Sequence, residues 1–293
     1  MKVLVIGKNG QLGRSIFKLA TILNNKELYE FKFIGRDELD LSKLDEIEKY
    51  IDQKDFNTIV NAAAYTSVDE AEENIKSANE INNLAVKKIA EISLRNNINL
   101  IHISTDYVFD GKSSKPYAEN DKTCTINIYG ETKLAGEKAI QKIMKNNATI
   151  IRTSWVYSEF GNNFVDTMMR LSKRLDEVKV VRDQIGSPTY ATDLAELIFK
   201  VIDCNHNHKK RTEIYHFSNE GEVSWDEFAK MIFRLSGINC RVIPIESKHF
   251  MTKAVRPKNS IMNKIKIQKD FNIKISCWKK SLNKAIKLID NNK

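Results

Sequence analysis

The feature that most restricts the fold is a glycine-rich turn near the start of the chain. An apolar run at 2–6 leads directly into Gly7-Lys8-Asn9-Gly10-Gln11-Leu12-Gly13, and an amphipathic stretch follows. This order predicts a buried strand, a tight turn and a helix. Glycines in such a turn let backbone N–H groups approach a pyrophosphate at the positive end of the helix. The pattern favours a dinucleotide-binding unit over a plain strand-to-helix turn.

The rest of the chain alternates apolar runs with helical periodicity. Further strands are predicted at 31–34, 58–62, 99–103, 148–152, 179–182 and 214–217. Helices are predicted at 42–52, 79–95, 131–146, 163–174, 192–202 and 224–236. This alternation predicts an α/β fold, a doubly wound parallel sheet (Rossmann) with a smaller C-terminal α/β substrate domain. We assign 1–155 plus about 179–220 to the NAD(P)-binding domain, and about 156–178 and 221–293 to the substrate domain.

Composition excludes several other classes of protein. Hydrophobic residues make up 42% and charged residues 29%, which is typical of a globular protein. No run approaches the roughly 20 apolar residues that a membrane helix needs, and only 3–6 are continuously apolar near the N-terminus, so we expect a cytoplasmic protein. The formal charge is +9, but lysines alternate with acidic residues, so we expect no nucleic-acid partner. The four cysteines are widely spaced, which favours free thiols over a zinc site.

Residues after the second and third strands are candidates for the remaining cofactor contacts. Gly35-Arg36-Asp37 stands where many NAD-binding chains carry an acid for the ribose. Arg36 can pair with a 2′-phosphate, which favours NADPH; alternatively Arg36 is a solvated charge and Asp37 takes the ribose. Asp40-Leu41 is a place where an adenine can rest. The small residues Ala62-Ala63-Ala64 let a flat cofactor lie close to the sheet.

A phenol and an ammonium form the candidate proton-transfer pair. Tyr129 and Lys133 are four residues apart, so on a helix they share one face. A free phenol has a pKa of about 10, and a nearby cation is expected to lower the pKa of Tyr129 toward neutrality. The alternative is an exposed lysine beside a packing tyrosine. Ser104 and Thr105 leave the preceding strand where a reactive cofactor ring would lie, and this combination favours proton transfer.

Two residues farther along the chain are candidates for substrate contact. Trp155 follows the strand at 148–152 and can offer a flat apolar wall to a sugar or base, with a core tryptophan as the alternative. Arg256 begins the segment Arg256-Pro257-Lys258-Asn259-Ser260, whose two cations can hold a diphosphate. The alternative is a solvated basic loop.

The segments that carry a resemblance to known proteins are GKNGQLG at 7–13, NAAAYTSVDEAE at 61–72, STDYVFDG at 104–111, YGETKLAGEK at 129–138, RTSWVY at 152–157, DQIGSPTY at 183–190, HFSNEGEVSWDEFA at 216–229 and RPKNS at 256–260. Through them the chain resembles the extended short-chain dehydrogenase/reductases and, within them, the dTDP-4-dehydrorhamnose reductase family. The resemblance implies NADPH-dependent reduction of the 4-keto group of dTDP-4-dehydro-L-rhamnose, with NADH as the alternative cofactor. We expect a monomer or homodimer.

The resemblance also implies roles for single residues. Tyr129 would donate the proton, Lys133 would grip the nicotinamide ribose and tune Tyr129, and Thr105 would orient the ketone. Asp106 and Trp155 would touch the sugar nucleotide. The pyrophosphate, the adenine and the inner cofactor face would be lined by Gly7, Gly10, Gln11 and Leu12, by Asp40 and Leu41, and by Ala62, Ala63 and Ala64.

The chain also departs from the family pattern. Some members bind magnesium through acidic residues where this chain has Ser15 and Thr192, so we expect no metal. Two other functions stay open at this point. One is a non-catalytic NADP-binding regulatory subunit resembling that of methionine adenosyltransferase. The other is a different nucleotide-sugar enzyme, either another 4-ketoreductase or an epimerase or dehydratase, of which the last two would regenerate their cofactor.

Overall fold

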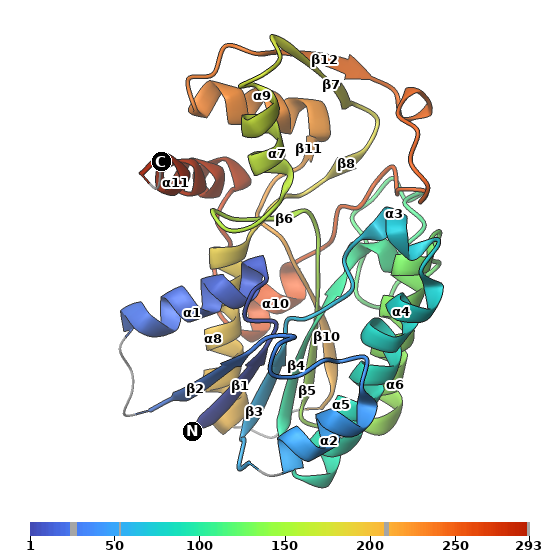
Figure 1. The fold of residues 1–293 in the computed structure, drawn as a ribbon, viewed down its shortest axis with the longest axis vertical. Coiled ribbons are helices and arrows are strands. Elements are labelled where there is room, and N and C mark those ends of the chain that lie inside the picture. The colour runs from blue at the N-terminus through green and yellow to red at the C-terminus, as the bar shows by residue number, and fades with distance from the viewer. Residues whose placement is uncertain (24–27, 53, 208–210, 292–293) are drawn as a thin grey trace.

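A six-stranded parallel sheet forms the centre of the computed structural model, which describes residues 1–23, 28–52, 54–207 and 211–291 (Figure 1). Its strand order is β10-β5-β4-β3-β1-β2. The order of the strands switches sides at β1, because β2 lies on one side of β1 and β3 on the other. This arrangement confirms the predicted doubly wound fold. The strands are β1 (Lys2–Ile6), β2 (Glu30–Ile34), β3 (Thr58–Asn61), β4 (Asn99–Thr105), β5 (Ala148–Thr153) and β10 (Glu213–Phe217).

Helices cover both faces of the sheet because successive strand residues point to opposite sides. In β1, Leu4 enters one buried cluster and Val5 the other. The first cluster lies under α2 (Leu44–Asp52), α5 (Ala85–Arg95) and α6 (Ile128–Ile143). The second lies under α1 (Gln11–Leu23), α8 (Ala191–Asn207) and α10 (Ile265–Asp270). The core is therefore two layers of side chains separated by the sheet.

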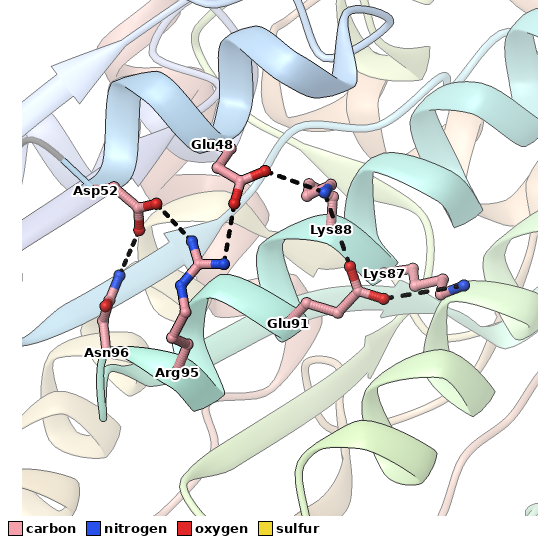
Figure 2. Close-up of polar contacts among 7 residues, drawn as sticks. All are labelled: Glu48, Asp52, Lys87, Lys88, Glu91, Arg95 and Asn96. Atoms are coloured by element: carbon pink, nitrogen blue, oxygen red, sulfur yellow. Dashed lines mark hydrogen bonds and ion pairs between the residues drawn. The ribbon is translucent and has the colours of Figure 1, made fainter.

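Exposed ion pairs join α2 to α5 above their apolar contact (Figure 2). Arg95 contacts Glu48 at 2.9 Å and Asp52, and Lys88 contacts Glu48 at 3.2 Å. Such surface pairs contribute little to stability individually. The buried Ile47 and other apolar side chains beneath them hold the helices in place.

The helix predicted at 79–95 is longer and has an irregular centre. It begins with α4 (Ile75–Asn79), widens into a π-helical segment at Glu80–Leu84 and continues as α5. The widened turn directs the buried Asn82 toward the backbone of Tyr65, from whose N–H it accepts at 2.9 Å and to whose carbonyl it donates at 3.1 Å. Asn82 also donates to Thr132 at 3.2 Å. The side chain therefore ties the loop after β3 to α6.

A second, smaller unit lies beyond the carboxyl ends of the sheet strands (Figure 1). Its apolar cluster joins residues from 155–181 to residues from 223–242 and to the last helix. Its elements are the paired β7 (Glu177–Val181) and β12 (Arg241–Ile245), β8 (Ile185–Gly186) with β11 (Val223–Ser224), β6 (Val156–Tyr157) with β9 (Thr189–Tyr190), and the helices α7 (Phe164–Leu171), α9 (Trp225–Leu235), η3 (Ser247–His249) and α11 (Trp278–Asn291).

One predicted strand belongs to a different unit from the one to which we assigned it. The strand predicted at 179–182 was grouped with the cofactor-binding domain, but β7 pairs with β12, and Val178 and Val180 pack in the second unit. Alternating burial along β7 suits a small two-stranded sheet covered on one face. Among the described residues, no helix combines the length and apolar character needed to cross a membrane.

Candidate active site

A cleft with a cavity volume of about 630 Å³ runs along the carboxyl edge of the sheet, where doubly wound folds bind ligands. An adjoining cavity of about 300 Å³ contains Asp40 and Leu41 and shares Arg36 with the cleft. The cleft brings together most of the predicted site residues: Gly7, Gly10, Gln11, Leu12, Arg36, Ala62, Ala63, Ala64, Thr105, Asp106, Tyr129, Lys133 and Trp155.

The glycine turn has the close packing that a phosphate cradle requires. Gly7 has φ of +102°, and a Cβ there would lie 2.9 Å from the backbone nitrogen of Ala63. A Cβ on Gly13 would lie 2.1 Å from the carbonyl oxygen of Gly7. Both positions therefore exclude a larger residue, so the start of α1 stays close to the end of β3. Gly10, Gln11 and Leu12 at the start of α1 line the cleft, and the first N–H groups of a helix are suited to binding an anion.

Gln11 links the glycine turn to the second unit. Its side chain accepts from Ser158 and Asn163, each at 3.0 Å, and donates to the carbonyl of Val156 at 3.3 Å. Gln11 therefore lines the predicted pyrophosphate site and also fixes the neighbouring wall of the cleft.

Two charged residues after β2 differ in their surroundings: Asp37 forms an ion pair, whereas Arg36 is exposed to solvent. Asp37 accepts from Lys8 at 3.0 Å, and the salt bridge lowers its pKa. The side chain of Arg36 is 80% exposed and lies 3.5 Å from Asp40. Asp40 accepts from the backbone N–H of Ser42 at 3.0 Å, and this bond is the first cause of its lowered pKa. Asp37 therefore already has a cationic partner, whereas the guanidinium of Arg36 faces solvent at the cavity edge.

Helix α6 carries Tyr129 in its first turn, because Asn127 accepts from the backbone N–H of Gly130 at 2.8 Å and caps the helix. The helix was predicted to begin at 131, so the cap moves its start ahead of Tyr129. Thr105 ends β4, accepts from the N–H of Tyr107 at 3.2 Å and lies near the phenol of Tyr129, whose pKa its hydroxyl lowers. Phenol and hydroxyl therefore meet at one point of the cleft.

Burial controls the protonation of the two central groups. Burial raises the pKa of Tyr129 to about 12, against the opposing effect of the Thr105 hydrogen bond. Burial lowers the pKa of Lys133 to about 8, against the charge of Glu137. The expectation that Lys133 would lower the pKa of Tyr129 is wrong for this structure, because desolvation of the phenolate dominates. Tyr129 is consequently a neutral phenol at neutral pH, with a proton to give.

Asp106 places a carboxylic acid in the cleft wall, and its side chain is only 2% exposed. Burial raises its pKa to about 6, while the nearby hydroxyls of Ser260 and Thr105 oppose the shift. Thr105 lies 3.0 Å from Asp106 Oδ1. The carboxyl group therefore titrates close to neutral pH and contacts the hydroxyl that also meets Tyr129.

Trp155 combines the two alternatives that the sequence left open. It lines the cleft, yet it also packs against the apolar cluster of the second unit. Its indole stacks on Trp225 with ring centroids 3.5 Å apart, and its backbone has φ of +49°. A Cβ on Gly186 would lie 2.6 Å from the Trp155 ring. Trp225 and Gly186 therefore hold the ring in place, and sequence reasoning singled out neither of them.

Arg256 lies apart from the other candidates. Its guanidinium donates to both carboxylate oxygens of Asp69, at 3.1 and 2.5 Å, and it lines neither of the two cavities. Asp69 belongs to α3 (Val68–Ala71) and also accepts from the N–H of Ala254 at 3.0 Å. The pair joins a loop of the second unit to the cofactor side of the cleft.

Buried polar residues behind the cleft were missed at the sequence level. His102 and Arg152 are each at most 2% exposed, and Arg152 pairs with the fully buried Glu137 at 2.7 Å. The available signal was a polar residue inside an apolar strand, as for His102 within 99–105. No group of three or more metal-ligating side chains gathers in the part of the chain that the structure describes.

A doubly wound sheet whose cleft joins Thr105, Tyr129 and Lys133 beside a glycine turn defines the class of extended short-chain dehydrogenase/reductases. Within this class, the chain belongs to the family described as RmlD substrate binding domain, whose sequence profile matches residues 1–291.

Similar proteins share nearly the whole length of the chain. A dTDP-4-dehydrorhamnose reductase of Aggregatibacter actinomycetemcomitans is 39% identical, covering 96% of this chain and 97% of its own. The crystal structure of a dTDP-4-dehydrorhamnose reductase from Clostridium acetobutylicum has a TM-score of 0.92 at 37% identity, with 99% and 100% covered. The Bacillus anthracis enzyme of the same name, in complex with NADP, has a TM-score of 0.91 at 36% identity, with 98% and 99% covered.

Proposed function

We propose that the chain is an NADPH-dependent dTDP-4-dehydrorhamnose reductase. It reduces the 4-keto group of dTDP-4-dehydro-L-rhamnose and forms dTDP-L-rhamnose. The observation that carries the proposal is the meeting of Thr105, Tyr129 and Lys133 in the cleft beside the glycine turn. Relatives that bear this activity in their names match the chain nearly end to end.

The residues around the glycine turn fit a dinucleotide. A Cβ at Gly7 would meet the backbone of Ala63, so glycine there lets the turn pack closely against the segment after β3 beside the cleft. The N-terminal N–H groups of α1, with Gly10, Gln11 and Leu12, would hold the pyrophosphate. Ala62, Ala63 and Ala64 would face the inner side of the cofactor, and Asp40 and Leu41 the adenine. When bound, NADPH supplies the hydride.

The exposed Arg36 supports a preference for NADPH. Its guanidinium can form charge-assisted hydrogen bonds to a 2′-phosphate at the edge of the shared cavities. Asp37, the alternative ribose ligand, is bonded to Lys8. We therefore assign Arg36 to the 2′-phosphate.

Tyr129 protonates the ketone oxygen as negative charge develops on it. A phenol with a pKa of about 12 retains its proton until the developing alkoxide, a stronger base, takes it. Thr105 orients the same oxygen beside the phenol. Trp155, backed by Trp225, provides a rigid wall for the sugar nucleotide, and Asp106 offers a polar contact in the same cleft. Lys133 holds the ribose beside the phenol.

The test is an NADPH-consumption assay over a panel of 4-keto sugar nucleotides, with NADH in parallel. We expect dTDP-4-dehydro-L-rhamnose to give the highest kcat/KM. Tyr129→Phe should reduce kcat by roughly 10²–10³, the usual loss of one donor to developing charge. NADPH affinity should stay within a few-fold, because the ring remains.

Three results would contradict the proposal. Turnover by Tyr129→Phe at the wild-type rate would show that Tyr129 is not the proton donor. Absence of NADPH oxidation with every keto sugar, together with a stoichiometric protein partner, would indicate a regulatory subunit. Cofactor retained through purification, with product formed but no net NADPH consumed, would indicate an epimerase or dehydratase.

A further inference from the structure

Asn127 makes two side-chain hydrogen bonds, and only one of them is needed to cap α6. Its Oδ1 accepts from the N–H of Gly130 at 2.8 Å, which is the cap. Its Nδ2 donates to the carbonyl of Val255 at 2.8 Å, although Val255 lies 128 residues farther along the chain. Asn127 is only 7% exposed, so its amide is largely shielded from water. The residue that begins the helix of Tyr129 is therefore also bonded to a loop of the second unit.

The two partners determine the orientation of this amide. A backbone N–H can only donate and a backbone carbonyl can only accept, so the oxygen of Asn127 must face Gly130 and its nitrogen must face Val255. Aspartate and serine cap helices about as well as asparagine does, because a cap needs only the acceptor. Among these three residues, only asparagine also carries an amide N–H that can bond a carbonyl beyond the cap.

The loop that Asn127 contacts is held at each of its residues. We call 254–256 the crossing segment, because it runs from the second unit to α3 on the cofactor side of the cleft (Figure 1). The N–H of Ala254 donates to Asp69 of α3 at 3.0 Å, and the guanidinium of Arg256 donates to the same carboxylate. Asn127 holds the carbonyl between them. The crossing segment is therefore bonded both to α3 and to the start of α6.

The first turn of α6 packs tightly against its surroundings. The N–H of Ile128 donates at 2.9 Å to Glu72, which directly follows α3. A Cβ on Gly130 would lie 2.2 Å from the carbonyl oxygen of Tyr107, so the turn contacts the segment after β4 directly. The ring of Tyr107 meets the ring of Tyr129 edge to face, with centroids 5.5 Å apart. A shift of this turn would therefore move the phenol of Tyr129 within the cleft.

We propose that Asn127 is a positioning residue that ties the first turn of α6 to the crossing segment, so that the place of the Tyr129 phenol in the cleft depends on the second unit. The cap alone fixes where the helix begins, whereas the bond to Val255 fixes the turn against the second unit. The inference rests on the proposed function, because Tyr129 donates a proton only in that reaction. Neither Asn127 nor the crossing segment lines the cleft or the adjoining cavity, so the effect reaches the substrate through Tyr129.

Asn127→Ser separates the two bonds. A serine hydroxyl can still cap α6, but the side chain is too short to reach the carbonyl of Val255. Single-turnover oxidation of NADPH with saturating sugar nucleotide measures the chemical step. Its rate should fall roughly 10- to 10²-fold, the effect expected from a small misplacement of a reacting group. The solvent deuterium isotope effect on this rate should rise, because proton transfer from Tyr129 becomes slower, while the Kd for NADPH should stay near the wild-type value.

Two further variants complete the kinetic experiment. Asn127→Asp keeps an acceptor for the cap but places a carboxylate oxygen against the carbonyl of Val255, so the same changes are expected even if Asn127→Ser does not fold. Lys253→Gln is the matched control. Lys253 precedes the crossing segment and pairs with Glu73 beside α3, but both side chains are more than half exposed. Loss of such a surface pair should leave the rate and the isotope effect at their wild-type values.

Hydrogen exchange followed by mass spectrometry tests the link without substrate or cofactor. In Asn127→Ser, the amides of the crossing segment should exchange faster than in the wild type. Unchanged exchange there, or a wild-type rate and isotope effect in both Asn127 variants, would overturn the inference. An equal fall in rate for Lys253→Gln would also count against a specific role of Asn127. A wild type that reduces no keto sugar would contradict only the proposed reductase, because the exchange experiment would still measure the link.

Discussion

At the scale of single residues, burial determines the chemistry more strongly than charge pairing does. The phenol of Tyr129 and the carboxyl of Asp106 both have raised pKa values, and desolvation is the first cause for each. Lys133 changes in the opposite direction for the same reason. Spacing in the sequence indicated that these groups belong together, but how far each is buried depends on packing from β3, β4 and the second unit.

Asp106 makes a prediction about stability and pH. Its folded-state pKa of about 6 lies above the usual value for aspartate, so the folded protein binds this proton more tightly than the unfolded chain. The resulting stability is present at low pH and is lost as pH rises through 6. Between pH 4.5 and pH 8, this group should therefore lower the free energy of unfolding of the wild type by on the order of 2 kcal/mol. Asp106→Asn should lack that loss. Urea unfolding of both proteins at the two pH values measures it.

Asp110→Asn supplies a control for that experiment. Hydrogen bonds from the N–H of Lys112 and the hydroxyl of Tyr117 lower the pKa of Asp110, so its ionised form stabilises the folded state above the unfolded pKa. Because pH 4.5 and pH 8 both lie above that unfolded pKa, this variant should lose a similar amount of stability at the two values. The same dependence on pH for both variants would contradict the assignment for Asp106.

At the scale of elements, the sequence indicated which segments are strands and helices but not their irregularities. Apolar alternation and the glycine turn were enough for the six strands of the sheet and for most of the helices that cover it, but α10 was not predicted. The start of α6 depends on the cap at Asn127, and the π-helical segment at Glu80–Leu84 depends on contacts with Tyr65 and Thr132. Tertiary hydrogen bonds of this kind leave no periodic signal in the sequence.

The π-helical segment makes a prediction of its own. Asn82→Ala removes a side chain that pairs both the N–H and the carbonyl of Tyr65, so two partly buried backbone groups lose their partner. The free energy of unfolding in urea should fall by about 1–3 kcal/mol. Asn83→Ala is the neighbouring control; Asn83 is only partly buried and donates to Asn79, so its loss should stay within about 0.5 kcal/mol. Equal effects would show that Asn82 has no special role.

At the scale of the whole molecule, the Arg256–Asp69 pair joins the two sides of the cleft. Arg256 was predicted to hold a diphosphate, and that contact stays a prediction, since its guanidinium here bonds Asp69. Sequence alone identified the cation but could not show an acid 187 residues away in the chain. The bridge positions the loop that includes Ala254, whose N–H also meets Asp69.

Variants of this bridge can distinguish two roles for Arg256, which are positioning the loop and binding the diphosphate directly. If Arg256 acts mainly through the loop, Arg256→Ala and Asp69→Asn should both raise KM for the sugar nucleotide by several-fold, and the double variant should add little. NADPH affinity should stay near the wild-type value, because neither residue lines the cofactor cavities. Steady-state kinetics and fluorescence titration measure the two quantities. A large rise in KM for Arg256→Ala alone, with Asp69→Asn unaffected, would instead support direct contact with the diphosphate.

The composition of the apolar cluster in the second unit has a consequence for the order in which the molecule is completed. Tyr157, Phe228 and Leu282 meet in it, although they lie far apart in the chain. During synthesis, the sheet and its glycine turn can assemble while the C-terminal residues are still inside the ribosome. The wall of the cleft that carries Trp155 gains its full support only when α11 has emerged. A nascent chain would therefore form its cofactor side first and its substrate side last.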